Sequence, residues 1–142
     1  MTTGARPHAP PRSSAWPWAR RLPLTARPGC VAEARSCTLG FLADVPDSMV
    51  VADAVLLVSE LVGNAVRHTG APRWLLLIRA PGLLRIEVGD ASPRPPLPRP
   101  PQGAEQEGGL GLFLLNRLAL CWGWHPSGPG KVVWCDLRLP AP

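Results

Sequence analysis

Apolar residues recur at helical spacing between positions 51 and 65, and polar residues form a second line along the same segment. The apolar positions follow the i, i+3, i+4, i+7 spacing of a stripe that faces a core, namely Val51, Ala54, Val55, Val58, Leu61, Val62 and Ala65. Glu60, Asn64 and His68 are four residues apart and therefore share another face of this helix. Placing a carboxylate and a carboxamide beside a core is unfavourable unless a polar group meets them. The segment therefore carries either a functional polar edge or a polar edge exposed to water.

Similar patterns place the other elements and predict the fold class. The expected elements are a short edge strand over 20–24, a helix over 28–43, a long helix from Asp47 or Ser48 to His68, strands over 74–78 and 83–89, a proline-rich loop over 92–103, a helix over 112–120, and strands over 121–125 and 131–139. The order is strand, two helices, hairpin, loop, helix, hairpin. This order predicts an α+β fold, a two-layer α/β sandwich in which helices cover one face of a mixed, mostly antiparallel sheet.

The positive charge lies mainly near the N-terminus. The chain of 142 residues has 15 basic and 10 acidic residues, a net charge of +5, and five of the arginines precede residue 28, where there is no acid. The remainder therefore has 15 − 5 = 10 basic and 10 acidic residues. We expect a disordered basic tail over 1–19 and one domain over 20–142. Such a tail can touch RNA, lipid or an acidic partner, but the neutral body argues against direct binding of nucleic acid.

The cysteines and the apolar segments also exclude several classes of protein. The four cysteines form no Cys-x-x-Cys pair and have no histidine at zinc-finger spacing, which argues against a zinc site of that kind. The N-terminus lacks the apolar core of a signal peptide, and no run of about 20 apolar residues indicates a membrane span. A cytoplasmic protein with reduced thiols is expected.

Three short motifs carry candidate chemistry. The oxygen of Asn64 can ligate Mg²⁺, which prefers oxygen donors and is often shared with phosphates, and Glu60 can accept a proton from an attacking hydroxyl. Asp90, where a strand ends, can accept a hydrogen bond from an exocyclic amine such as that of adenine, although Asp before Ser and Pro is also an ordinary turn opener. The glycines of 108–111 precede a helix and can approach an anion, or they can simply join a loop to a helix.

Other readings of these residues are weaker. The glycine spacing is not that of a Walker A loop, and no βαβ unit follows it as in a Rossmann fold. Lys131, which is the single lysine, follows a Gly-Pro-Gly turn. It can neutralise a phosphate, but a solvated turn lysine is the simpler interpretation. His68 can contact phosphate or cap its own helix. Tryptophans at strand positions are explained more simply by packing than by ligand stacking.

In this order the motifs resemble those of the GHKL (Bergerat-fold) ATPase superfamily, in particular the histidine-kinase-like domain of small actinobacterial anti-sigma-factor serine kinases. Residues 60–68 look like the N box, residues 90–92 like the first glycine box and residues 109–112 like the second. The resemblance extends from about residue 20 to residue 139. Ser92 departs from it, because the family often has glycine there.

The resemblance implies the following roles. Asn64 would hold Mg²⁺, Asp90 would read the adenine amine, and Glu60 would activate a serine hydroxyl of a partner protein. The other positions implied to lie at the nucleotide are Arg67, His68, Ser92, Gly109, Leu110, Gly111 and Leu112. The implied cofactors are ATP and Mg²⁺, and the implied partners are a sigma factor and an anti-anti-sigma protein with a STAS fold. A homodimer is an expectation of the family alone.

Two functions remain open from the sequence. The first is an ATP-binding anti-sigma regulator that transfers the γ-phosphoryl group to Ser or Thr of an anti-anti-sigma partner, chemistry that needs mainly positioning and charge neutralisation. The second is a nucleotide-responsive binding module that sequesters a transcription regulator without phosphorylating it. Glu60 favours the kinase, whereas the altered first glycine box at Ser92 favours the binding module.

Overall fold

The computed structural model describes residues 18–96 and 111–140. The elements in chain order are β1 (Trp18–Pro23), α1 (Cys30–Phe41), α2 (Ser48–Asn64), the π-helix η2 (Ala65–Thr69), β2 (Pro72–Ala80), β3 (Leu83–Asp90), α3 (Gly111–Leu118), β4 (Cys121–Ser127) and β5 (Gly130–Arg138). This is the expected order of strand, helices, hairpin, helix and hairpin. The prediction of an α+β fold is confirmed.

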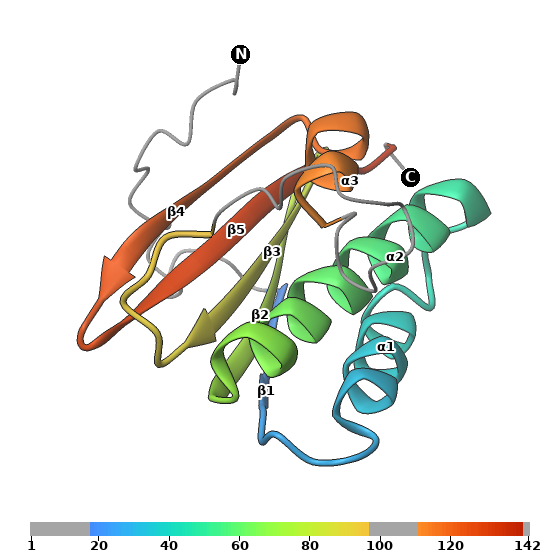
Figure 1. Ribbon diagram of the computed structural model, residues 1–142. Coiled ribbons are helices and arrows are strands. Elements are labelled where there is room, and N and C mark those ends of the chain that lie inside the picture. The colour runs from blue at the N-terminus through green and yellow to red at the C-terminus, as the bar shows by residue number, and fades with distance from the viewer. Residues whose placement is uncertain (1–17, 97–110, 141–142) are drawn as a thin grey trace.

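The sheet has the strand order β1-β2-β3-β5-β4, and the helices cover one of its faces (Figure 1). All four strand pairs are antiparallel. The expectation of a mixed sheet is therefore refined, since no parallel pair occurs among the strands that the structure describes. Pro81 and Gly82 form the turn between β2 and β3, where Gly82 has a φ of 75°.

The core lies between the sheet and helix α2. Alternate residues of each central strand face this helix, as the two-residue period of a strand requires. The buried side chains of α2 and of the strands include Ala54, Leu57, Val58, Leu61, Val62, Leu75, Leu77, Leu84, Ile86, Val88, Val133, Cys135 and Leu137. The apolar stripe read from the sequence therefore faces the core at most of its positions, whereas Val51 and Val55 are half-buried.

Helix α2 begins where the sequence predicts and ends differently. The carboxylate of Asp47 accepts hydrogen bonds from the backbone N–H groups of Met49 at 3.0 Å and Val50 at 3.2 Å, an N-cap. The α-helix stops at Asn64, and a π-helical turn continues to Thr69, after which Gly70 takes a left-handed φ of 62°. The expectation of one regular helix to His68 is wrong for its last turn.

The combined helical segment Ser48–Thr69 is long and apolar enough to cross a membrane by length and composition alone. Its buried stripe packs in the core described above, as in the core helix of a soluble protein. This observation is therefore weak support for a membrane span.

The first strand lies at the edge of the sheet, as predicted, and begins at Trp18. The strand begins two residues before the expected range 20–24, because Trp18 and Ala19 already pair with β2. The next two residues are arginines, and each contacts an aromatic ring. The guanidinium of Arg20 lies 5.4 Å from the Phe41 ring, and that of Arg21 lies 5.6 Å from the Trp74 ring. The rest of the expected tail, residues 1–17, lies outside the described residues.

Candidate functional site

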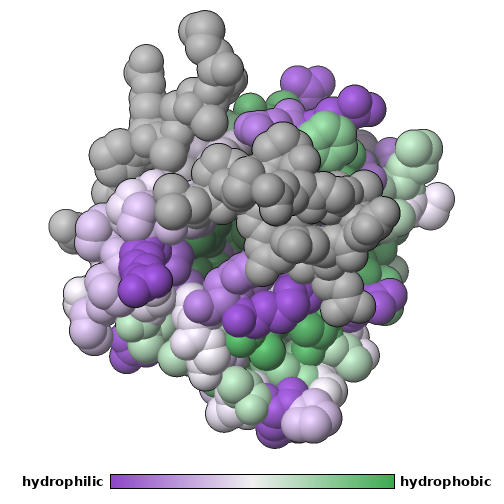
Figure 2. Space-filling view, viewed as in Figure 1, coloured by the Kyte–Doolittle hydropathy of each residue, from purple (hydrophilic) through white to green (hydrophobic). Residues whose placement is uncertain are grey.

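The end of strand β3 and the end of the long helix lie close together (Figure 1). Their connection is fixed by the backbone, since the N–H of Ala91 donates to the carbonyl of Ala71 at 3.0 Å. In the space-filling view, hydrophilic residues lie over the end of the helix and over the segment after β3, and a recess with hydrophobic residues separates them (Figure 2). The structure therefore brings two of the three predicted motifs to one recess.

Asp90 is the last residue of β3, and its side chain is buried. The ammonium group of Lys131 lies 3.0 Å from Oδ2 and 3.1 Å from Oδ1 of this carboxylate. The backbone N–H of Ser92 donates to Oδ1 at 2.8 Å, so Asp90 also opens the turn that follows it. The functional and the structural interpretation of Asp90 are compatible, because Oδ1 accepts both of these hydrogen bonds and Oδ2 is left with the ionic contact to Lys131 alone.

The expectation that Lys131 is a solvated turn lysine is wrong. Strand β5 pairs with β3 so that Lys131 stands directly opposite Asp90. Both side chains point to the helix-covered face of the sheet, as Val88 and Val133 do, and only 7% of the Lys131 side chain is exposed. A lysine is buried in this way when it is paired, and removing either partner would leave the other charge buried and uncompensated.

Two glycines adjacent in the chain to Asp90 and Lys131 allow close packing around these residues. A Cβ atom at Gly130 would lie 1.9 Å from the carbonyl oxygen of Asp90, a distance that no side chain tolerates. A Cβ atom at Gly89 would lie 2.5 Å from the indole ring of Trp74, which packs on this glycine. The position of Asp90 is therefore fixed by close packing as well as by its ion pair with Lys131.

The carboxylate of Glu60 has one oxygen that is buried without a hydrogen-bond partner among the described residues. The residue is half-buried on α2, and the unpartnered atom is Oε2. A buried polar atom without a partner is unfavourable in a finished core. The simple interpretation of Glu60 as part of a water-exposed helix edge does not account for this atom.

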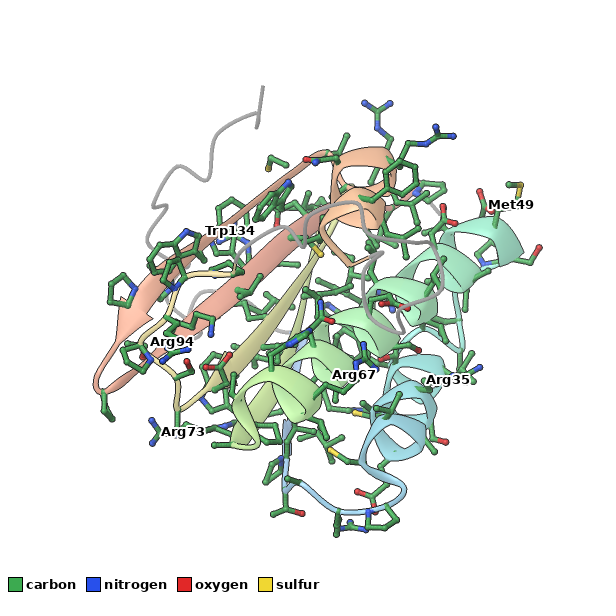
Figure 3. The ribbon with its side chains drawn as sticks, in the orientation of Figure 1. Arg35, Met49, Arg67, Arg73, Arg94 and Trp134 are labelled. Carbon is green, nitrogen blue, oxygen red and sulfur yellow. The ribbon has the colours of Figure 1, made fainter. Side chains whose placement is uncertain are left out.

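Asn64 lies one turn after Glu60, about 6 Å further along the helix. Its Oδ1 atom accepts a hydrogen bond of 3.2 Å from the guanidinium of Arg67, whose side chain reaches back along the helix (Figure 3). The same guanidinium would lie 3.0 Å from a Cβ atom at Gly63. The oxygen of Asn64 thus already faces a cation, and it keeps one of its two lone pairs for another.

His68 lies in the π turn that follows Asn64, since residues 65–69 form i→i+5 hydrogen bonds. Its side chain is exposed, whereas those of Glu60 and Asn64 are half-buried. Of the predicted polar line, Glu60 and Asn64 therefore lie nearer the core, and Arg67 contacts Asn64.

The residues present fit a magnesium ion that takes most of its ligands from phosphate and water. Within the described ranges, no cluster of three or more His, Cys, Asp or Glu residues is arranged to hold a metal. Mg²⁺ commonly keeps several waters and binds through one or two protein oxygens together with substrate phosphates. The Oδ1 atom of Asn64, which already attracts a cation, is such an oxygen.

The second glycine motif is only partly described. Gly109 and Leu110 lie outside the described residues, and Gly111 and Leu112 form the start of α3. Gly111 is therefore the first residue of the helix and not a residue before it, as expected. Ser92 is half-buried, and its Oγ atom accepts a hydrogen bond from the N–H of Arg94 at 3.3 Å. The expected contacts of these residues with nucleotide remain predictions.

A second buried ion pair lies on the opposite face of the sheet. Arg85 donates to both carboxylate oxygens of Asp136 at 2.7 and 2.9 Å, and this hydrogen bonding raises the pKa of the Arg85 guanidinium. Glu87 lies two residues further on β3, and burial raises the pKa of its carboxyl. Both side chains alternate with residues that face α2, so they point away from the recess.

These features agree with the comparison to known protein families. The family model of the histidine kinase-like ATPase domain matches residues 24–135. The chain belongs to this family. A family of ATPase domains implies that ATP is the nucleotide of the site, and the matched range includes Glu60, Asn64, Asp90 and Lys131.

Two known proteins are similar to this histidine kinase-like ATPase domain. An uncharacterized protein of Streptomyces coelicolor is 34% identical over 96 residues, which cover 58% of this chain and 91% of that protein. The crystal structure of the RsbU and RsbW domains of Rv1364c from Mycobacterium tuberculosis matches with a TM-score of 0.62 and 21% identity over 87% of this chain. The matched part is 33% of the mycobacterial chain, so this chain spans about a third of that protein. This second likeness supports the fold.

The sequence patterns did not predict the burial of one residue and the contact of another. Lys131 was expected to be solvated, although it is the single lysine and lies in β5 among buried residues. Arg67 was placed near the nucleotide only through the family resemblance, and its contact with Asn64 was not expected. Its three-residue separation from Asn64 on a helix is a local signal that predicts such a contact.

Proposed function

We propose that the protein is an anti-sigma regulator that binds Mg-ATP and transfers the γ-phosphoryl group to Ser or Thr of an anti-anti-sigma partner with a STAS fold. The observation that supports this most strongly is the buried, unpartnered Oε2 atom of Glu60 on the helix that also carries Asn64. A general base needs a carboxylate oxygen that is free to accept a proton. Family membership and the fold make ATP the expected phosphoryl donor.

Each residue has a separate task in this proposal. The carboxylate of Asp90 accepts a hydrogen bond from the adenine amine and so orients the nucleotide. Asn64 holds the magnesium ion, which neutralises charge on the phosphates. Glu60 accepts the proton of the partner's hydroxyl while the hydroxyl oxygen bonds to the γ-phosphorus. The bond from that phosphorus to the bridging oxygen breaks, and its electron pair leaves with ADP.

The residues near the nucleotide have supporting roles. Arg67 can turn from Asn64 to a phosphate oxygen once a metal competes for the amide oxygen. We place the backbone of Gly109 and Gly111, with Leu110 and Leu112, beside the phosphates, and Ser92 beside the base. We also place the exposed side chain of His68 near the nucleotide. The protein acts in the cytoplasm, as a homodimer that sequesters a sigma factor, with no direct contact to nucleic acid or membrane.

Binding is tested by calorimetric titration of Mg-ATP into the wild type, Asn64→Ala and Asp90→Ala. The proposal expects binding that depends on magnesium, a loss of that dependence in Asn64→Ala, and weaker binding by Asp90→Ala with or without magnesium. Arg73→Ala, an exposed arginine at the start of β2, is the control. A wild type without magnesium-dependent binding contradicts the proposal.

Transfer is tested with radiolabelled ATP and STAS-fold proteins from the same genome. Glu60→Gln is expected to bind ATP normally and to lose at least about a hundredfold in the transfer rate, the usual contribution of a general base. Glu33→Gln, which removes a carboxylate exposed on α1, is expected to behave as the wild type. If Glu60→Gln transfers phosphate at the wild-type rate, Glu60 is not the general base. If the wild type binds ATP but transfers phosphate to no partner, the non-catalytic binding module is the correct function.

A further inference from the structure

The carboxylate of Asp90 has little hydrogen-bonding capacity left. An ionised carboxylate offers about four lone-pair positions on its two oxygens. Lys131 donates to Oδ1 and its ammonium lies 3.0 Å from Oδ2, and the backbone N–H of Ser92 also donates to Oδ1. The free acceptor capacity is therefore on Oδ2, where a base could donate a hydrogen bond.

The charge state of Asp90 decides which base can use this position. A carboxylate only accepts hydrogen bonds, whereas a protonated carboxyl can also donate one. A buried carboxylate is stable as a hydrogen-bond acceptor when an opposite charge contacts it. The ammonium of Lys131 supplies this charge, because it contacts both oxygens and is itself buried. Without it, Asp90 would lie 4% exposed beside apolar residues with only a backbone N–H as partner.

We propose that Lys131 determines base specificity by acting through Asp90. It holds Asp90 as an acceptor, so the site selects a base with an exocyclic amine, as in adenine, and rejects a base with a carbonyl oxygen in that place. An oxygen of the base opposite the free lone pair of Oδ2 would meet a second acceptor and be repelled. This inference rests on the proposed function, in which Asp90 reads the adenine amine.

Strand pairing explains why a residue at the start of β5 contacts the Asp90 carboxylate. The carbonyl of Asp90 is in such close contact with Gly130 that no Cβ atom fits there. The next residue, Lys131, is the register partner of Asp90, and its side chain lies on the same face of the sheet. Strand register therefore delivers one side chain from β5 to the Asp90 carboxylate, and that side chain is the single lysine of the sequence.

The test compares binding of ATP and inosine triphosphate, which differ at the amine that Asp90 would read. Equilibrium dialysis measures both affinities for the wild type, Lys131→Met, Lys131→Arg and Arg138→Met. The wild type is expected to prefer ATP by at least about tenfold, since a site built to accept a hydrogen bond rejects an analogue without the donor. Lys131→Met should lose most of this preference, and Lys131→Arg should retain it. Arg138→Met, an exposed charge on the same strand, is the control.

The ratio of the two affinities separates specificity from general damage. A loosened site would weaken both nucleotides and leave the ratio unchanged, and that result in folded Lys131→Met overturns the inference. If Lys131→Met does not fold, Lys131→Gln keeps a hydrogen-bond donor without the charge, and an unchanged ratio there overturns it equally. The proposed function survives such a result if Asp90→Ala loses ATP binding. A wild type that binds ATP and inosine triphosphate equally contradicts both.

Discussion

Asp90 and Asn64 lie at the ends of two elements that contact each other, and each side chain is paired with a cation, but their surroundings differ. The Asp90 carboxylate is buried on a central strand and is held by Lys131, 41 residues away in the sequence. The Asn64 amide is half-buried near the end of a helix, and it is held by Arg67, three residues away and exposed. One end of the site is thus fixed by the tertiary structure, and the other by a local contact.

This difference teaches which part of the site can change when a ligand binds. Moving Asp90 or Lys131 would expose a buried charge or break the strand pairing around it, so this end is already in its final form. Turning Arg67 away from Asn64 breaks one exposed hydrogen bond and leaves the core intact. Substitutions at the strand end should therefore affect folding and binding together, whereas those at the helix end should affect binding alone.

The comparison is tested most directly by Asp90→Ala beside Asn64→Ala. Asp90→Ala leaves the Lys131 ammonium buried without a partner and should lower the free energy of unfolding by about 3–5 kcal/mol. Asn64→Ala removes a weak exposed bond and should change it by no more than about 0.5 kcal/mol. Urea denaturation without nucleotide measures both values. Equal losses in the two variants would show that the two ends do not differ in this way.

The next largest effect concerns the turn before Lys131. Gly130→Ala should lower the free energy of unfolding by about 1–3 kcal/mol and weaken ATP binding, because the new methyl group displaces the backbone at Asp90. Gly128→Ala lies in the same turn with no atom within 4 Å of its Cβ position, and only its φ of 56° opposes the substitution. Thermal unfolding and calorimetry are the measurements. If Gly128→Ala weakens ATP binding as much as Gly130→Ala does, contact with Asp90 is not the cause.

At the helix end, Arg67→Met should leave stability unchanged and alter the magnesium dependence of ATP binding. Removing the guanidinium frees the Oδ1 atom of Asn64, so the magnesium concentration for half-maximal binding should fall by up to about fivefold, the equivalent of one weak hydrogen bond. Arg73→Met, which removes another exposed arginine, is the matched control. A rise in the magnesium requirement would indicate that Arg67 assists the metal instead of competing with it.

The smallest predicted effect on stability concerns a second buried carboxylate on strand β3. Glu87 is buried on the same strand as Asp90, its Oε2 has no hydrogen-bond partner among the described residues, and burial raises its pKa. An acid with a raised pKa in the folded state favours folding fully only below its unfolded value of 4.5, and this contribution is lost as pH rises through the folded pKa. At neutral pH, Glu87→Gln should therefore be more stable than the wild type by about 1 kcal/mol or less. The difference should disappear in acid, as urea denaturation across the pH range can show.

The sequence predicts those features that depend on neighbouring residues. The Asp47 cap, the Pro81–Gly82 turn and the apolar stripe of α2 each follow from a pattern within a few positions, and each is confirmed. The sequence motifs also located Asp90 at a strand end and Glu60 and Asn64 on one helix. The two-layer arrangement followed from the order of these elements.

The features that the sequence did not predict depend on longer-range or finer geometry. The burial of Lys131 follows from the register of β3 with β5, which no local pattern reveals. The end of α2 at Asn64 follows from a change of hydrogen-bond register, which the apolar pattern does not reveal because its last residue, Ala65, is still buried. Arg67 was not expected to contact Asn64, since that contact depends on the conformation of a long side chain.

The π turn at residues 65–69 also sets the strand that follows it. A π turn closes its hydrogen bond over five residues where an α turn needs four, so this short segment accommodates one residue more. Deleting one residue here would continue α2 as an ordinary helix and draw β2 forward by one position. A shift of one position exchanges the two faces of a strand, and Leu75 and Leu77 would leave the core for the opposite side. The single additional residue thus keeps the helix and the sheet in phase, and a length change in this segment should be tolerated only together with a compensating change before Pro72.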